Sequence, residues 1–242
     1  MKAAPPKIFL TAEWRHLAML NYEIEPAVLA PFLPAETELD FWNGKTFISA
    51  VGFQFLNTRV RGISIPFHRN FEEVNVRFYV RRKADDGWRR GVVFIKELVP
   101  RAAIAFVARA FYNENYSALP ISHRIERAGD DAKSAFYCWR FAGRENFLKV
   151  ETRGSAQPPV DGSLQEFIAE HYWGYAVQRD GSTMEYRVEH PRWRLWEAQT
   201  AELRCDAAGL HGEVFRDALE RPPSSACLAD GSEVKVFAGV RL

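Results

Sequence analysis

The sequence predicts an α+β fold dominated by β-strands, in which a closed or nearly closed sheet carries two or three packed helices. Residues 46–56 read TFISAVGFQFL, and both faces of this segment are largely apolar. A strand of that kind is covered on both sides, as in a barrel wall beneath helices or the middle of a sheet. Residues 71–81 instead alternate between apolar and polar side chains, which is the period of a strand with two different faces.

Further strands are expected wherever β-branched and aromatic residues cluster. Asp85, Asp86 and Gly87 form the tip of a hairpin that joins the strand at 71–81 to the next one. The other expected strands are 17–24, 92–98, 136–141, 184–189 and 234–240.

Three segments carry helix signals. Residues 26–32 form a short turn of helix, because proline suits its first position and Pro34 stops it. Residues 100–112 are rich in alanine and also begin with a proline at a permitted position. A third helix is expected over residues 164–175, where Ser163 is the N-cap and Glu166 completes a capping box.

The length of 242 residues allows a sizeable core without disulfides or metals as staples. Two stretches, 153–163 and 221–225, are rich in Gly, Pro or Ser. Neither is long enough to require a domain boundary. We therefore expect a single domain over residues 1–242.

Charge and composition exclude several classes of protein. Lys plus Arg is 32 against 31 for Asp plus Glu, so a net charge of +1 gives no footprint for nucleic acid or for a membrane surface. The N-terminus lacks the apolar core of a signal peptide, and the longest apolar run, 102–108, is too short to cross a bilayer. The three cysteines are widely spaced without a C-x-x-C pair, which indicates reduced thiols and a cytoplasmic location.

The usual catalytic signatures are absent: the sequence has no G-x-G-x-x-G, Walker A, G-x-S-x-G or H-E-x-x-H motif. A Rossmann domain and an α/β-hydrolase are therefore not expected. The neighbouring pairs Glu170–His171 and Glu189–His190 offer carboxylate and imidazole groups, but surface or hydrogen-bonded core histidines are the simpler interpretation. Nothing in the sequence requires a metal or an organic cofactor.

One face of the strand at 71–81 carries groups suited to a polar cavity, namely the side chains of Glu73, Asn75, Arg77 and Tyr79. A rise of ~3.3 Å per residue separates Glu73 from Arg77 by about 13 Å, so each needs its own partner, water or ligand. The alternative interpretation is an ordinary solvent-exposed face.

Residues 108–117 run from the expected helix at 100–112 into a polar loop. Loops carried on a rigid scaffold are where binding groups collect. The alternative is a capped helix end with tyrosines on the surface. The polar residues of this segment include Arg109, Tyr112, Glu114, Asn115 and Tyr116.

Together these segments resemble DUF2071, the uncharacterised YqjF-like bacterial branch of the acetoacetate decarboxylase-like superfamily. The resemblance covers roughly residues 10–240. It implies a single β-barrel-like domain with flanking helices and an internal polar cavity. The strings that carry it are WRHLAMLNY at 14–22, FEEVNVRFYV at 71–80, ARAFYNENY at 108–116 and EHPRW at 189–193.

In acetoacetate decarboxylases the cavity contains an arginine near the first strand, a glutamate on a central strand and a lysine pair after a helix. The resemblance places Arg15 at the arginine and Glu73 at the glutamate. The lysine pair falls on Tyr116 and Ser117, and neither can form an imine. Since that decarboxylation proceeds through a Schiff base on a lysine of lowered pKa, it is not expected here.

Lys96 is the one other lysine that could replace the missing pair. On the expected strand at 92–98 it would share a face with Val92, Phe94 and Leu98, as a desolvated and nucleophilic amine. Alternatively it reaches the rim of the barrel or pairs with a carboxylate.

Two functional hypotheses follow. The first is an enzyme or degenerate enzyme, of lyase-like or proton-transfer type, acting on a small oxo-acid or enolisable carbonyl compound. Arg15 would bind a carboxylate, Glu73 would move a proton and Tyr116 would donate to an enolate oxygen. The other candidate substrate-binding residues are Asn75, Arg77, Arg109, Tyr112 and Glu114.

The second hypothesis is a non-catalytic protein that binds or senses a small-molecule ligand in the same cavity. A structural or protein-interaction domain with a vestigial cavity is a third possibility. A homo-oligomer also remains open, because the aromatic residues Trp193 and Trp196 suit an interface as well as a core.

Overall fold

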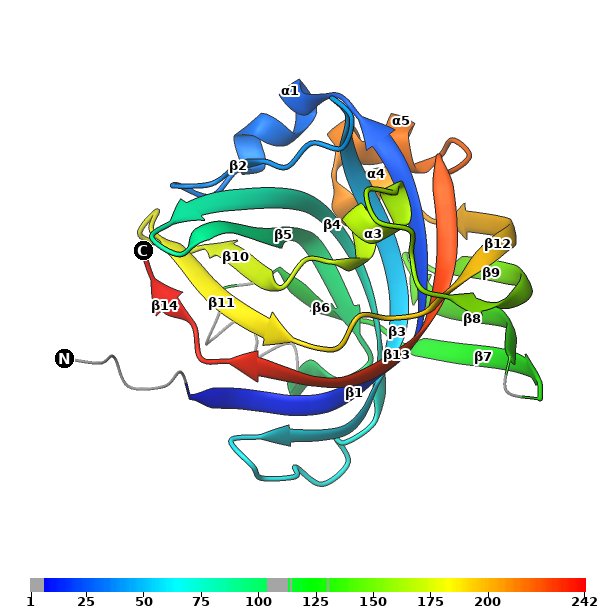
Figure 1. Cartoon of the computed structure of the whole chain (residues 1–242). Coiled ribbons are helices and arrows are strands. Elements are labelled where there is room, and N and C mark those ends of the chain that lie inside the picture. The colour runs from blue at the N-terminus through cyan, green and yellow to red at the C-terminus, as the bar shows by residue number, and fades with distance from the viewer. Residues whose placement is uncertain (1–6, 104–112, 114, 130) are drawn as a thin grey trace.

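The computed structural model describes residues 7–103, 113, 115–129 and 131–242 (Figure 1). Within these residues the strands form one 14-stranded sheet, and the helices are few and short. This confirms the predicted strand-dominated fold.

Seven strands of the sheet close into a ring, because β11 pairs with β10 on one side and with β13 on the other. All neighbours in the ring are antiparallel except β10 and β5, which run parallel. In order around the ring these strands are β11 (Thr183–Glu189), β10 (Trp173–Val177), β5 (Gly87–Val99), β4 (Phe71–Ala84), β3 (Thr46–Val60), β1 (Ile8–Ile24) and β13 (Ser225–Phe237).

Both faces of β3 are buried over most of its length, as its sequence predicts. The faces of β4 separate as expected: Val74, Val76 and Phe78 pack in the core outside the ring, whereas Glu73, Asn75 and Arg77 face its interior. The inner face of the ring carries a second apolar cluster, which includes Met19, Val51 and Phe53.

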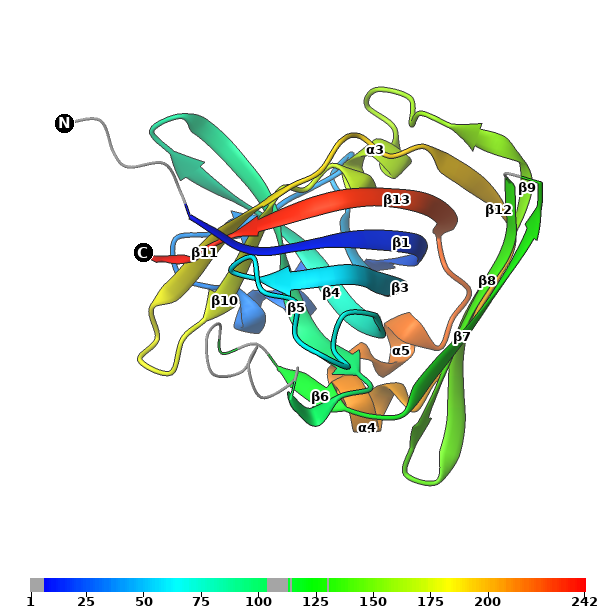
Figure 2. The same cartoon turned by 90° about the horizontal axis from the view of Figure 1, so that it is seen from below.

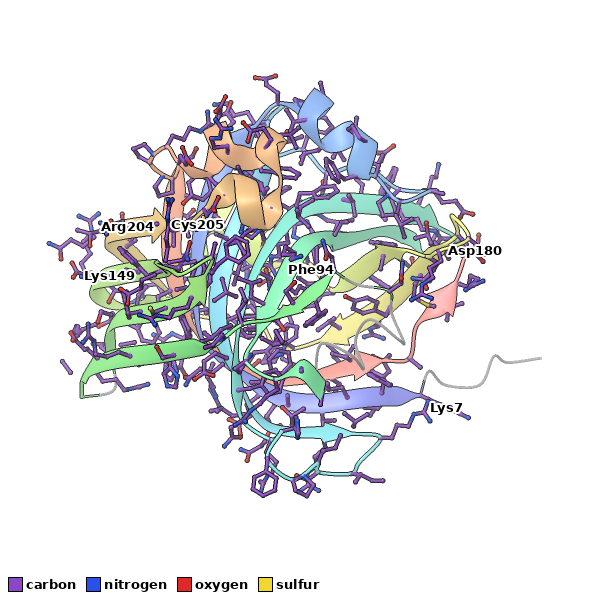
Figure 3. All side chains as sticks on the ribbon, turned by 180° about the vertical axis from the view of Figure 1, so that it is seen from behind. Lys7, Phe94, Lys149, Asp180, Arg204 and Cys205 are labelled. Atoms are coloured by element: carbon purple, nitrogen blue, oxygen red, sulfur yellow. The ribbon has the colours of Figure 1, made fainter. Side chains whose placement is uncertain are left out.

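The sheet continues from β13 as a four-stranded extension that projects to one side of the ring (Figure 2). Gly52 of β3 lets the extension approach, because a Cβ atom there would lie 2.7 Å from the Tyr137 ring. Lys149 and Arg204 lie on the outer side of the extension, among other polar side chains (Figure 3). Its strands are β12 (Leu195–Arg204), β9 (Arg144–Gln157), β8 (Asp131–Phe141) and β7 (Ile121–Ala128).

Short elements complete the structure. Leu29, Leu210, Phe215 and Leu219, all from helical segments, pack into the core outside the ring. The remaining strands are β2 (Glu38–Leu39), β6 (Tyr116–Ala118) and β14 (Val240–Arg241), which pair with β4, β5 and β11. The helical segments are α1 (Pro26–Leu29), η1 (Ala30–Phe32), α3 (Leu164–Ala169), α4 (Ala207–His211), η2 (Glu213–Phe215) and α5 (Arg216–Leu219).

Two of the expected helices can be compared with the structure. The turn at 26–32 is present as α1 and η1. The Ser163 N-cap of α3 is confirmed, since the Ser163 hydroxyl accepts from the Glu166 backbone N–H at 3.2 Å. The capping box is not complete, because the Glu166 carboxylate accepts from the backbone N–H of Gly162 and not of Ser163. That helix is shorter than predicted, because the chain leaves helical geometry at Glu170 and pairs as β10 from Trp173. Most of the helix expected at 100–112 lies outside the described residues.

None of the helices in the described ranges is both long enough and apolar enough to cross a membrane.

Candidate functional site

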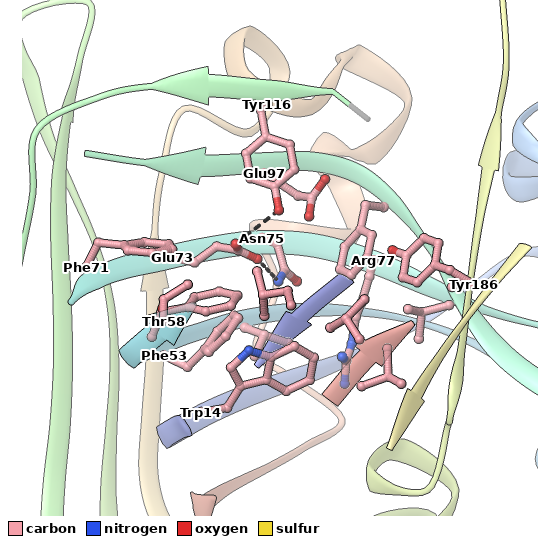
Figure 4. Close-up of a pocket in the computed structure, with 18 of the residues that line it drawn as sticks. Trp14, Phe53, Thr58, Phe71, Glu73, Asn75, Arg77, Glu97, Tyr116 and Tyr186 are labelled. Atoms are coloured by element: carbon pink, nitrogen blue, oxygen red, sulfur yellow. Dashed lines mark hydrogen bonds between the residues drawn. The ribbon is translucent and has the colours of Figure 1, made fainter. Parts of the chain in front are cut away.

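A cavity of about 340 Å³ lies inside the ring, and every strand of the ring contributes to its lining (Figure 4). Most of the lining is apolar. The aromatic residues are Phe9, Trp14, Phe53, Phe55, Phe71, Phe94, Tyr116, Trp173 and Tyr186. Such a concave, mostly apolar cavity with a few converging polar groups is typical of small-molecule sites.

The acids, the amide and the guanidinium of the described lining gather on one wall. Glu73, Asn75 and Arg77 occupy alternate positions of β4, so all three point into the ring. Glu97 lies opposite Asn75 in the pairing of β4 with β5, and Tyr116 lies opposite Glu97 on β6. The main-chain register of three strands therefore brings these polar side chains together.

The Glu73 side chain is a deeply buried acid of this wall, with 3% of the residue exposed, and Glu97 beside it is buried as well. Its Oε1 accepts from Asn75 Nδ2 at 3.0 Å, and its Oε2 accepts from the Tyr116 hydroxyl at 3.2 Å (Figure 4). Burial raises the pKa of Glu73 to about 7, although the two hydrogen bonds and the charge of Arg77 act in the opposite direction. Near neutral pH this carboxyl group is therefore present in both protonation states.

Arg77 supplies positive charge to the cavity. Its Nε is buried without a hydrogen-bond partner, and its guanidinium carbon lies 5.8 Å from the centre of the Tyr79 ring. No carboxylate of the described residues lies within ion-pair distance of Arg77. A ligand with a negative charge would therefore meet a guanidinium that has no competing ion pair.

His171 also lines the cavity, between α3 and β10. Its Nε2 lies 3.2 Å from Asp40 Oδ2, which also accepts from Arg90 Nε at 2.6 Å. Burial lowers the pKa of His171 to about 4, so the ring is neutral at pH 7. Sequence spacing gave no signal for this pair, since 131 residues separate the two side chains.

Among the described lining residues we find neither a metal-binding cluster nor a lysine. Over the described ranges, no three His, Cys, Asp or Glu side chains converge on a point suited to a metal ion. No lysine is found among the described lining residues either. The polar wall is thus equipped for hydrogen bonding, proton transfer and charge pairing.

The family model for DUF2071, an uncharacterized conserved protein, matches residues 11–233. The chain belongs to the DUF2071 family. One relative, the uncharacterized protein YqjF of Bacillus subtilis (strain 168), is 26% identical over 202 residues, which cover 82% of this chain and 80% of YqjF.

Solved structures with a similar fold come from enzymes. The enduracididine biosynthesis enzyme MppR, complexed with the condensation product of pyruvate and imidazole 4-carboxaldehyde, matches with a TM-score of 0.69 at 15% identity, over 98% of this chain and 90% of MppR. Acetoacetate decarboxylase from Legionella pneumophila subsp. pneumophila str. Philadelphia 1 matches with a TM-score of 0.66 at 12% identity, over 100% of this chain and 92% of that enzyme. At these identities the likeness establishes the fold of this DUF2071 protein.

The structure does not bring Arg15 into the cavity, in contrast to the placement taken from the resemblance. Side chains alternate along β1, so Trp14 faces the interior and Arg15 faces away. The Arg15 guanidinium donates to Glu13 Oε2 at 2.8 Å and lies 3.4 Å from Asp230 Oδ2. It is already paired outside the ring, and among the described lining residues of this DUF2071 protein Arg77 is the arginine that faces the cavity.

The prediction that Lys96 shares a face with Val92 and Phe94 is also wrong. The register of β5 shifts between the Arg77–Phe94 and Val76–Lys96 pairs, so β5 has one extra residue there. This bulge turns Lys96 away from the cavity, where its Nζ donates to Asn115 Oδ1 at 3.2 Å. The same bulge turns Glu97 into the cavity. Strict alternation along residues 92–98 does not predict this orientation of Glu97.

The remaining candidates fall into two groups. The structure places Glu73, Asn75, Arg77 and Tyr116 together in the lining, as a cavity site requires. Arg109, Tyr112 and Glu114 lie outside the described residues. Both Trp193 and Trp196 are buried within the chain.

Proposed function

We propose that this protein catalyses proton transfer on a small oxo-acid or enolisable carbonyl compound, with Glu73 as the acid–base group. The observation that supports this most directly is a carboxyl group buried in the cavity wall with a pKa near 7. A general base is most effective when its pKa lies near the working pH, because it is then both available and strong enough to take a proton.

The wall supplies the groups that such a reaction needs. Ionised Glu73 removes a proton from the carbon next to the ligand carbonyl, and the C–H electron pair becomes part of an enolate. Tyr116, whose hydroxyl lies 3.2 Å from Glu73 Oε2, donates to the enolate oxygen. Protonated Glu73 then returns its proton to carbon, so the group ends as it began.

Arg77 takes the part that the resemblance assigned to Arg15. Arg77 lies four residues after Glu73 on β4, and both side chains face the cavity. A ligand carboxylate bound to Arg77 would therefore lie along the polar wall. MppR, of similar fold, has been solved with pyruvate as well as with a pyruvate condensation product. Those ligands are oxo-acids or derived from one, which favours this substrate class.

Hydrogen–deuterium exchange tests the proposal without knowledge of the final product. The protein is incubated in D₂O with a panel of 2-oxo and 3-oxo acids, and loss of the C–H signal beside the carbonyl is followed by NMR. We expect exchange with at least one acid, reduced by roughly 10²- to 10⁴-fold in Glu73→Gln. Glu72→Gln is the matched control, because Glu72 is absent from the cavity lining and bonds to His123 at 2.7 Å.

A binding or sensing protein that uses the same cavity is the alternative, and the predominantly apolar lining favours it. Under this alternative the acids bind to wild type and to Glu73→Gln, but no acid exchanges. Exchange at the same rate in Glu73→Gln and wild type would overturn the assignment of Glu73.

A further inference from the structure

We infer that the ligand of this cavity is a carboxylic acid with an aromatic or branched apolar body, whose carboxylate pairs with Arg77 while the body fills the aromatic part of the ring. The inference deepens the proposed function and concerns the same site. It specifies what the cavity binds and does not depend on whether Glu73 turns the ligand over.

The charge of Arg77 is the first argument. Three other arginines of β4 and β5 have a carboxylate partner: Arg82 and Arg89 pair with Glu185, and Arg90 pairs with Asp40. Arg77 has none among the described residues, and its Nε is buried without a hydrogen-bond partner. Burying an unpaired charge in an apolar cavity costs free energy. The guanidinium of Arg77 is therefore suited to bind an anionic ligand.

The neighbours of Arg77 do not supply that anion. Tyr79, His171 and His190 all feel its charge. Burial raises the pKa of Tyr79 and lowers the pKa of both histidines, so the three groups are neutral at pH 7. Glu73 lies four residues away along β4, and burial keeps its carboxyl group partly protonated. Glu97 is also buried on this wall, but it forms no ion pair with Arg77. A ligand carboxylate would therefore supply the paired counter-charge that Arg77 lacks.

The aromatic part of the lining is the second argument. Trp14 meets Phe53 and Phe55 edge to face, with ring centres 5.4 and 5.8 Å apart. Phe55 in turn stacks on Phe71 at 4.6 Å. In Figure 4 Trp14 and Phe53 lie beside the polar residues of β4, and Phe53 is the neighbour of Glu73 in the pairing of β3 with β4. Aromatic walls of this kind gain most from an apolar or aromatic ligand group, through burial and edge-to-face contacts.

Size is the third argument. The cavity volume of about 340 Å³ lies at the lower end of the range of roughly 300–1,000 Å³ for sites that enclose drug-sized ligands. A three-carbon acid on Arg77 would leave the aromatic part of the lining without a partner. An acid that also carries a phenyl ring or a branched alkyl chain would cover both parts.

Isothermal titration calorimetry with matched acids tests the inference. The probes are pyruvate and phenylpyruvate, which differ in the ring, and 3-phenylpropanoate and 3-phenylpropanamide, which differ in the charge. We expect phenylpyruvate to bind about 10- to 100-fold more tightly than pyruvate, since it buries one more ring. We expect the amide to bind at least about 30-fold more weakly than the acid, because a neutral amide cannot pair with the charge of Arg77.

The variant Arg77→Gln should bind 3-phenylpropanoate more weakly by a similar factor. It should also bind the acid and the amide with equal affinity. Arg15→Gln is the matched control and should leave both affinities unchanged, since Arg15 pairs with Glu13 outside the cavity. Urea unfolding of Arg77→Gln guards against a folding defect. Because the variant removes an uncompensated charge, it should be at least as stable as wild type.

The outcomes separate this inference from the proposed function. Aromatic acids that bind through Arg77 without deuterium exchange would support the ligand class and overturn the catalytic role of Glu73. Exchange on pyruvate with no gain in affinity from the phenyl ring would overturn the ligand class and leave catalysis standing. Equal affinity of acid and amide in wild type would overturn the role of Arg77.

Discussion

Replacing Glu73 with glutamine should change how the free energy of unfolding depends on pH. Burial raises the pKa of Glu73 from 4.5 to about 7 in the folded protein, whereas the unfolded chain returns the carboxyl group to its ordinary value. Below pH 4.5 the group is protonated in both states and favours neither. As the pH rises toward 7 only the unfolded state loses the proton, so stability falls, and it stops falling above the folded pKa.

The magnitude follows from the size of the shift. A shift of about 2.5 pKa units corresponds to roughly 3 kcal/mol, of which about 2 to 3 kcal/mol is lost between pH 5 and pH 8. Glutamine cannot titrate, so Glu73→Gln escapes this loss. The stability of the variant relative to wild type should therefore rise by about 2 to 3 kcal/mol from pH 5 to pH 8.

Urea unfolding of both proteins at the two pH values measures this difference, in which the contributions of groups that do not interact with Glu73 cancel. Glu197→Gln is the control, because Glu197 pairs with Arg153 at the surface and its pKa lies below the ordinary value of 4.5. Its stability relative to wild type should be the same at pH 5 and pH 8. The same flat result for Glu73→Gln would refute the argument, since Glu73 would then be ionised in the folded protein at pH 5.

Three further predictions concern the cavity and its wall. Tyr116→Phe removes a hydrogen bond that lowers the pKa of Glu73. In the same urea series the loss of stability with rising pH should therefore extend to higher pH. An unchanged dependence of stability on pH would contradict a hydrogen bond between Tyr116 and Glu73. Lys96→Met should leave acid binding unchanged, and borohydride should trap no oxo-acid on the wild-type lysine; a covalent adduct would contradict the bulge that turns Lys96 outward. Gly231→Ala should cost about 3 kcal/mol or more in urea unfolding, because Gly231 has φ of +86° and a Cβ atom would strike the backbone carbonyl oxygen of Trp14. A stability within about 0.5 kcal/mol of wild type would show that β1 and β13 can separate there at little cost.

Local sequence pattern was sufficient where one periodicity holds over a whole element. The strict alternation of 71–81 predicts which side chains of β4 face the cavity, and the Asp85–Gly87 tip and Ser163 cap follow from local chemistry. These elements were predictable because neighbouring residues alone determine them.

Local sequence pattern did not predict the secondary structure where pairing with distant strands overrides local preference. The sequence of β12, LWEAQTAELR, consists largely of residues that favour helices, yet it is a strand because β9 and β13 pair with it. Likewise the residues of β10 were expected to continue α3, but they pair with β5 and β11. No window of neighbouring residues contains this information.

The candidate site divides in the same way. The sequence by itself determined that one strand carries an acid, an amide and a guanidinium on a single face. Only the tertiary structure decided that Arg15 faces away from the cavity that Arg77 lines. It also decided that a bulge in β5 points Glu97 into the cavity and Lys96 out of it, and that His171 contacts Asp40. The physical reason is that side-chain composition and alternation are local properties. The direction in which a side chain finally points depends on register, bulges and ring closure, which are set by pairing between distant strands.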